Sequence, residues 1–229
     1  MKFRHLLSVL AIGLGLLNSS ALHAAPVITG GTEVFAGSYS SDFMQGYDFV
    51  STTNQSLTAL GLWDEGSNGL PRSFQVGLWF TGTQTLLASA AIDSADPLDS
   101  SVTVAGGQWR YETLASPVSL LSGTTYTLAW QVGSLALSVA DSLFPQYSSL
   151  SVNPNVTIAD QSRFQGGAAF TFPTGVTVAG SFRGMVNAQL APAAVPEPAT
   201  LGLVAIAGLG MLAARRRMRT GSSAISGLS

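Results

Sequence analysis

The stretch that decides the fold reads Thr125-Tyr126-Thr127-Leu128-Ala129-Trp130-Gln131-Val132. Large apolar side chains occupy every second position of this stretch, and smaller or polar side chains stand between them. An alternation with a period of two is typical of a β-strand that buries one face. The stretch therefore predicts a strand whose aromatic and aliphatic face packs into a core.

Similar patterns on both sides of this stretch predict further short strands. In residues 108–114, Trp109 and Tyr111 fall on one face, while Arg110 and Glu112 fall on the other. Gly, Pro, Asn, Asp and Ser separate the candidates, and no long 3.6-residue period appears before residue 195. The expected strands are 46–51, 57–63, 74–80, 86–92, 108–114, 118–121, 125–132, 135–139, 168–172 and 185–190. This pattern predicts an all-β fold, a single antiparallel β-sandwich or jelly-roll-like domain over residues 25–194 with two packed layers.

One tripeptide occurs twice, as Gly61-Leu62-Trp63 and as Gly77-Leu78-Trp79. Each copy ends a candidate strand, and a connection rich in Asp, Gly, Ser and Asn lies between them. We interpret the two copies as the arms of a hairpin. The spacing is not repeated elsewhere, so it does not indicate a solenoid or a propeller.

Composition and charge exclude several classes of protein. The 229 residues include no cysteine, 46% are hydrophobic and 10% are charged, so neither a disulfide framework nor a disordered chain fits. Residues 25–194 hold four Arg against eleven Asp and Glu, a net charge of −7. An acidic body repels phosphate backbones, and we therefore expect no nucleic-acid partner.

The amino-terminal end has the layout of an export signal. Lys2 and Arg4 precede an apolar run over 6–17, and small residues follow it up to Ala24 and Ala25. This order is typical of a secretory signal peptide, and the run is shorter than the roughly 20 residues of a membrane span. We assign residues 1–24 to a signal-peptide helix that directs the chain to the Sec translocon. Signal peptidase would remove it after Ala24 or Ala25. An uncleaved anchor is the alternative.

Three features follow one another near the carboxyl end. Pro196-Glu197-Pro198 is followed by the uncharged run 199–214 and then by Arg215-Arg216-Arg217-Met218-Arg219. The prolines would hold Glu197 in an extended segment outside the apolar run. The run would form a helix of about 24 Å, short for a core of about 30 Å, and arginine snorkelling with local thinning can bridge the difference. The positive-inside bias would place the arginines and a short tail, 220–229, in the cytoplasm.

Residues 195–219 thereby resemble the PEP-CTERM sorting signal of Gram-negative bacteria. The resemblance implies that an exosortase recognises Pro196, Glu197 and Pro198 and removes the transmembrane helix. It also implies an exported protein that passes from an inner-membrane-anchored precursor to the cell surface, the extracellular matrix or a biofilm. A plain single-span membrane anchor is the alternative.

The body carries a second resemblance. Its runs Leu60-Gly61-Leu62-Trp63-Asp64, Val76-Gly77-Leu78-Trp79 and Trp109-Arg110-Tyr111 are similar to an uncharacterised β-sandwich domain of bacterial exported proteins. The similarity covers about residues 43–133. It implies a fold and an extracellular context, and it supplies no catalytic residue.

The body offers few groups for catalysis. His5, His23 and Lys2, the only histidines and lysine, fall in the predicted signal peptide. The mature chain would then lack His, Lys and Cys, which excludes a Ser-His triad, a Cys nucleophile, a Schiff-base lysine and zinc sites built on His or Cys. Loop carboxylates that could form a glycosidase pair are Asp64, Glu65, Asp93, Asp96 and Asp99.

The loop after Trp63 is a candidate calcium site, and no other cofactor is expected. Asp64, Glu65 and Asn68 offer hard oxygen ligands in a turn that contains glycine, which suits calcium. Gly66 and Gln75 stand where an EF-hand would place ligands, so the frame is not an EF-hand. A turn that caps a hairpin, without any metal, is the alternative.

Four tryptophans could offer a surface for stacking sugars, at positions 63, 79, 109 and 130. All four sit in apolar alternation, which favours core packing. We therefore expect a non-enzymatic exported protein of the envelope or matrix. The alternative is a secreted carbohydrate-binding module or a carboxylate-dependent glycoside hydrolase, with extracellular polysaccharide as the candidate partner of the body.

Overall fold

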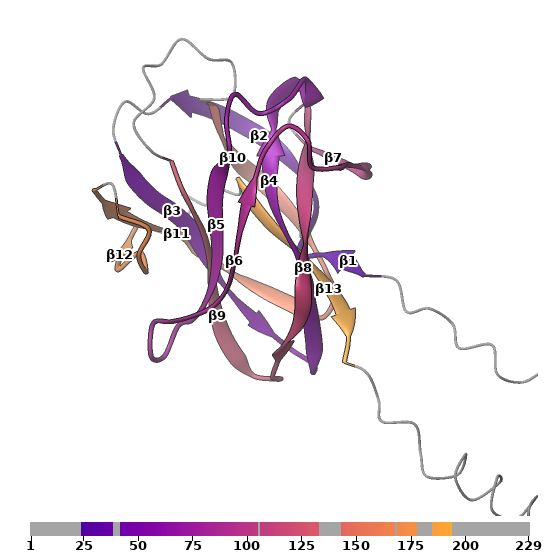
Figure 1. Cartoon of the computed structure of the whole chain (residues 1–229), viewed down its shortest axis with the longest axis vertical. Coiled ribbons are helices and arrows are strands. Elements are labelled where there is room, and N and C mark those ends of the chain that lie inside the picture. The colour runs from indigo at the N-terminus through magenta and orange to yellow at the C-terminus, as the bar shows by residue number, and fades with distance from the viewer. Residues whose placement is uncertain are drawn as a thin grey trace, which may run out of the picture. The chain divides into compact units, whose positions relative to one another are not determined.

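The computed structural model describes residues 24–38, 42–104, 106–132, 143–167, 169–177 and 185–193. The predicted signal peptide up to residue 23, the expected strand 135–139, the sorting signal 195–219 and the tail 220–229 lie outside these ranges. Within the ranges the chain is almost entirely strand, with one 3-10 turn, η1, at Glu65–Ser67 (Figure 1). Every strand pair that the structure describes is antiparallel, which confirms the all-β sandwich.

A five-stranded sheet forms one layer, in the order β1-β13-β4-β8-β7. Its strands are β1 (Ala25–Pro26), β13 (Val186–Pro192), β4 (Gln55–Asp64), β8 (Gly107–Leu120) and β7 (Leu98–Val104). The first and last strands of the body lie side by side in it, because Ala25 pairs with Leu190. Residues from the two ends of the described chain therefore complete one sheet.

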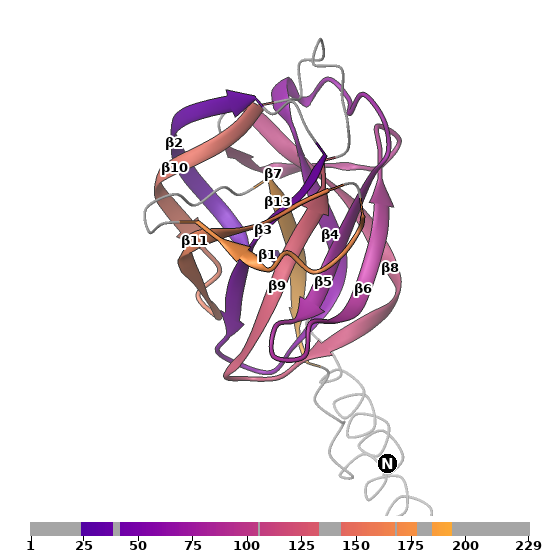
Figure 2. The same ribbon diagram turned by 90° about the vertical axis from the view of Figure 1, so that its left-hand side faces the viewer.

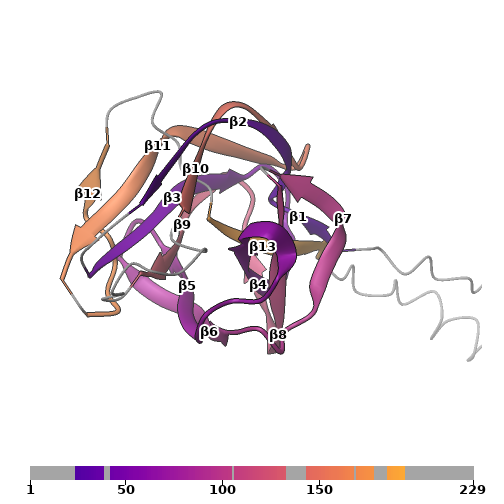
Figure 3. The same ribbon diagram turned by 90° about the horizontal axis from the view of Figure 1, so that it is seen from above.

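A six-stranded sheet forms the facing layer, in the order β12-β11-β3-β9-β5-β6. Its strands are β12 (Gly175–Val176), β11 (Val156–Gly166), β3 (Phe43–Ser51), β9 (Thr124–Gln131), β5 (Phe74–Phe80) and β6 (Thr85–Ile92). Seen from above, β3, β9 and β5 lie on one side and β13, β4 and β8 on the other (Figure 3). A two-stranded ribbon of β2 (Ile28–Ser38) and β10 (Leu143–Val152) adds to this architecture (Figure 2).

The core lies between the two large sheets. Tyr126, Leu128 and Trp130 of β9 are all buried in it, as the alternation in this strand predicts. Trp63 and Trp109 enter the same core from β4 and β8, where they stand opposite each other in the register. The inward face of β9 is therefore the centre of the sandwich.

The opposite face of the six-stranded sheet carries a second, smaller cluster. Met44, Trp79, Ala129 and Phe172 are buried there, and Phe170 packs against them. Ala129 alternates with the inward residues of β9, which places this cluster on the outer side. The Trp79 ring lies 5.2 Å from the Phe170 ring and 6.5 Å from the Phe172 ring, between centroids.

Two predictions about local structure are wrong. The copies Gly61-Leu62-Trp63 and Gly77-Leu78-Trp79 are not arms of one hairpin, because β4 and β5 belong to different sheets. The expected strand 168–172 is also wrong over residues 169–172, which carry no strand and instead place Phe170 and Phe172 over the outer face. Both errors arise because apolar alternation does not reveal which sheet a segment joins.

Other expected strands are extended or merged, and some are missed. Expected strands 108–114 and 118–121 form the single strand β8, whose register with β4 shifts between Leu57 and Ala59. The prediction missed β2, β7, β10, β11 and the two short strands β1 and β12. The apolar alternation is hard to recognise in three of these strands. β2 contains glycines, β10 contains Pro145, and β11 pairs irregularly with β3.

Substitution of Gly61 by Ala should destabilise the body. A Cβ at this position would lie 2.5 Å from Cε1 of the Tyr111 ring, which covers the glycine from β8. Overpacking a buried contact of this kind costs about 1–3 kcal/mol. Chemical denaturation of residues 25–193 measures the loss. Gly166→Ala is the matched control, because no atom lies within 4 Å of its added Cβ, and an equal loss in both variants would contradict the packing argument.

Candidate functional sites

A buried ion pair joins the ends of β4 and β8. The Arg110 Nε donates to Asp64 Oδ2 at 2.7 Å, and the side chains are 10% and 0% exposed. The two residues are 46 positions apart in the sequence, and the pairing of β4 with β8 brings them together. Both side chains also contact the backbone of neighbouring loops, through the Asp64 carboxylate oxygens and the Arg110 Nη1.

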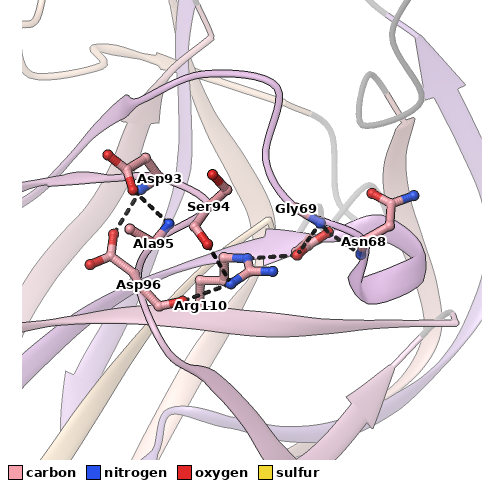
Figure 4. Close-up of polar contacts among 8 residues, drawn as sticks. Asn68, Gly69, Asp93, Ser94, Ala95, Asp96 and Arg110 are labelled. Atoms are coloured by element: carbon pink, nitrogen blue, oxygen red, sulfur yellow. Dashed lines mark hydrogen bonds and ion pairs between the residues drawn. The ribbon is translucent and has the colours of Figure 1, made fainter.

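These backbone contacts fix two of the connections that cross between the sheets (Figure 4). The Asp64 carboxylate accepts hydrogen bonds from the backbone N–H groups of Asn68, at 3.2 Å, and of Gly69, at 3.1 Å, in the connection from β4 to β5. The Arg110 Nη1 donates to the carbonyls of Ser94 and Asp96, at 3.0 and 2.7 Å, in the connection from β6 to β7. We call the loops 64–69 and 93–97 the apex of the body.

The predicted calcium ligands all lie at the apex. Asp64 is fully buried and engaged with Arg110, Asn68 contributes its backbone N–H to Asp64, and Glu65 is partly buried. In the described part of the chain, no group of three or more His, Cys, Asp or Glu side chains is placed to hold a metal ion. The calcium site stays a prediction, and a cation there would compete with Arg110 for the Asp64 carboxylate.

Three of the other candidate carboxylates, Asp93, Asp96 and Asp99, accept hydrogen bonds from backbone N–H groups close to them in the sequence. Asp93 and Asp96 close their own turn, where the Asp93 N–H donates to Asp96 Oδ2 at 2.7 Å and the Ala95 N–H donates to Asp93 Oδ1 at 2.8 Å. Asp99 accepts from the backbone N–H of Ser101 at 2.9 Å. Local turn geometry therefore accounts for these acids.

Sequence reasoning missed one partner of this turn, Glu112 of β8. Its side chain is exposed and hydrogen-bonds with Asp96, and this bond raises the pKa of Glu112 above its usual value. The negative charges of Asp96 and Asp93 add to the shift. The outward position of Glu112 in the alternation of 108–114 was visible in the sequence, but its contact with residue 96 was not.

A second ion pair lies on the outer face of the six-stranded sheet. Arg163 of β11 holds Asp48 of β3 through its Nε, which lies 2.9 Å from Oδ2, and the Thr127 hydroxyl donates to Oδ1 of the same carboxylate at 2.6 Å. The guanidinium carbon of Arg163 lies 5.5 Å from the centre of the Phe172 ring. This pair holds the segment over the outer cluster in place.

The tryptophans form no exposed platform. Trp63, Trp79, Trp109 and Trp130 are each at most 3% exposed. Three of them lie in the central core, and Trp79 lies beneath Phe170 and Phe172 on the outer face. Their rings are therefore covered by the protein itself.

The sorting residues fall outside the described ranges. These are Pro196, Glu197, Pro198, Arg215, Arg216, Arg217 and Arg219. The part of the chain that the structure does describe contains no helix with the length and hydropathy of a membrane span. The sorting motif therefore rests on the sequence and on its comparison with known families.

Two family models match the chain. One, described as a domain of unknown function (DUF4082), matches residues 29–182. The other, described as the PEP-CTERM protein-sorting motif, matches residues 194–217. These matches confirm the predicted combination of an uncharacterised domain with a sorting signal. No curated protein matches the chain.

Substitution of Arg110 by Met should strongly destabilise the body. The Asp64 carboxylate would stay buried without its counter-charge, and breaking such a pair from one side costs about 3–5 kcal/mol. Arg163→Met is the control, since its pair with Asp48 is more exposed and should lose only about 1 kcal/mol. Urea unfolding of both variants measures the difference, and equal losses would show that burial does not set the strength of the apex pair.

Substitution of Glu112 by Gln should raise the melting temperature at pH 7.5 but not at pH 4. Because the pKa of Glu112 is raised in the fold, the folded state holds this proton more tightly than the unfolded chain. The pair with Asp96 is therefore favourable at low pH and becomes repulsive as the pH rises through the raised pKa. Glutamine keeps a donor and never carries the charge.

Thermal unfolding followed by circular dichroism at the two pH values measures this effect. Asp42→Asn removes one negative charge from another part of the body and serves as the control. If Glu112→Gln raises the melting temperature equally at both pH values, the hydrogen-bonded proton between Glu112 and Asp96 is not the cause.

Proposed function

The chain belongs to the family of the domain of unknown function DUF4082, and from this premise and its PEP-CTERM motif we propose a non-enzymatic protein of the cell envelope or extracellular matrix. The motif marks it as an exported protein sorted by an exosortase. In this proposal Sec exports the chain, the tail helix holds it in the inner membrane, and exosortase cuts near Pro196-Glu197-Pro198. The body is then delivered to the cell surface or matrix.

The observation that carries the proposal is the position of the motif relative to the body. The motif match begins at residue 194, and the last strand, β13, ends at Pro192. The Ala193 N–H still donates to the Asn54 carbonyl at 3.3 Å. Glu197 follows four residues later, a reach of about 14 Å in an extended chain. Only a few residues of the sequence therefore separate the last strand of the body from the proposed processing motif.

The contacts of the body's acids support a structural role. Asp64 and Asp48 are engaged by Arg110 and Arg163, so both carboxylates take part in contacts that hold neighbouring strands together. The half-buried Asp96 and the exposed Glu112 are hydrogen-bonded, which is closer than the separation of about 5–9.5 Å between glycosidase carboxyl groups. These acids therefore do not favour the hydrolase alternative, and the covered tryptophans do not favour a sugar-stacking module.

Substitution of Glu197 by Ala should abolish processing. The cut requires recognition of the carboxylate between the two prolines, so the variant should keep its tail and stay in the membrane fraction. Cell fractionation and mass spectrometry of the product measure this. Thr200→Ala, three residues further along, is the control and should be processed normally. Release of Glu197→Ala at the normal mass would remove the exosortase assignment for this chain.

A further inference from the structure

The body has a distinct end from which the chain leaves. At this end β13 finishes beside the start of β4 and the end of β8, since Gln55 pairs with both Pro192 and Leu120. Four loops lie at the same end: Thr52–Asn54, Thr81–Gln84, Leu121–Gly123 and Asn153–Asn155. We call these four loops the base. The apex lies at the other end of β4, where Asp64 pairs with Gln108.

Hydrogen bonds join the loops of the base across the two sheets. The Ser122 N–H donates to Asn54 Oδ1 at 2.9 Å, and the Thr52 N–H donates to the Asn155 carbonyl at 2.9 Å. The Thr81 N–H donates to the Thr125 carbonyl at 3.3 Å, beside the same end of β9. The base is therefore a continuous surface that belongs to the folded body.

This surface carries no charged residue. Its four loops contain only Thr, Asn, Gly, Gln, Leu, Ser and Pro, and Leu121 is 60% exposed. The charged residues whose side chains the structure describes all lie elsewhere: Asp42, Asp48, Asp64, Glu65, Arg72, Asp93, Asp96, Asp99, Arg110, Glu112 and Arg163. Eight acids against three arginines give this set a net charge of −5. Among the side chains that the structure describes, the negative charge is thus kept out of the loops at the exit of the chain.

The chain between the body and the apolar run is short, so the distribution of charge affects how the body can lie near the membrane. From Ala193 to Ala199, where the apolar run begins, six residues span at most about 20 Å. Electrostatic repulsion between an acidic protein surface and anionic lipid reaches about 8–10 Å at physiological salt. A body held within such a distance meets that repulsion at every charged face, and the uncharged loops of the base contribute none to it.

We propose that the base rests on the lipid headgroup layer of the membrane that holds the uncut precursor. The inference depends on the proposed insertion of the tail. The uncharged loops and the exposed Leu121 face the headgroups, while the acidic apex points away from them. The body is thereby oriented before the cut, with its processing segment held at the membrane surface.

Depth-resolved fluorescence quenching of the uncut precursor in vesicles tests this orientation. The chain has no cysteine, so Ser122→Cys at the base and Ser73→Cys near the apex each introduce a single labelling site on an exposed residue. In vesicles that contain phosphatidylglycerol and headgroup spin-labelled lipid, we expect quenching at position 122 to exceed that at 73 by about twofold or more. Adding Leu121→Asp to Ser122→Cys should reduce quenching in anionic vesicles but not in zwitterionic ones.

The outcomes separate the two proposals. Equal quenching at both positions in a precursor that floats with the vesicles overturns the orientation and leaves the anchored tail intact. Quenching at 122 that arises only after exosortase is added overturns the lipid contact and assigns the base to the enzyme. A precursor that does not float with the vesicles overturns both the membrane-inserted tail and the orientation built on it.

Discussion

The ion pair between Asp64 and Arg110 holds two of the connections by which the chain passes between the two large sheets. The connection from β4 to β5 carries the chain from the five-stranded to the six-stranded sheet, and the connection from β6 to β7 carries it back. One carboxylate holds the first crossing by its backbone N–H groups, and one guanidinium holds the second by its carbonyls. Additional hydrogen bonds offset the cost of burying an ion pair, and the two loops supply such bonds to Asp64 and to the Arg110 Nη1. These two crossings and the pair therefore depend on each other.

Much of the central architecture could be predicted from the sequence. The alternation in residues 125–132 fixes which side chains of β9 enter the core, because a strand has only two faces. The turn closed by Asp93 and Asp96 and the ion pair of Asp64 with Arg110 could not be predicted as sites. Whether Asp64 meets a cation or Arg110 depends on the pairing of strands far apart in the sequence, which no local pattern records. The same limit made Gly61 and Gly77 look like parts of one hairpin, whereas each glycine accommodates an aromatic ring in a different layer.

The body and the tail of the chain differ in the kind of evidence that they carry for function. The body places its tryptophans under other residues and engages its buried acids with arginine. The tail carries the recognisable signal, and its match begins only two residues after the last strand ends. This arrangement is consistent with a protein whose sorting is specified at its carboxyl end and whose body is a stable, passive cargo.

The place of β13 in the five-stranded sheet also determines when the body can fold. This strand is the last in the chain, yet it lies between β1 and β4 rather than at an edge. Its partner β1 is separated from it by nearly the whole body, and contacts between such distant segments form slowly. In the export route that we propose, the five-stranded sheet would not be complete until residue 192 had left the translocon. Folding of the sandwich would then follow translocation and coincide with insertion of the apolar tail.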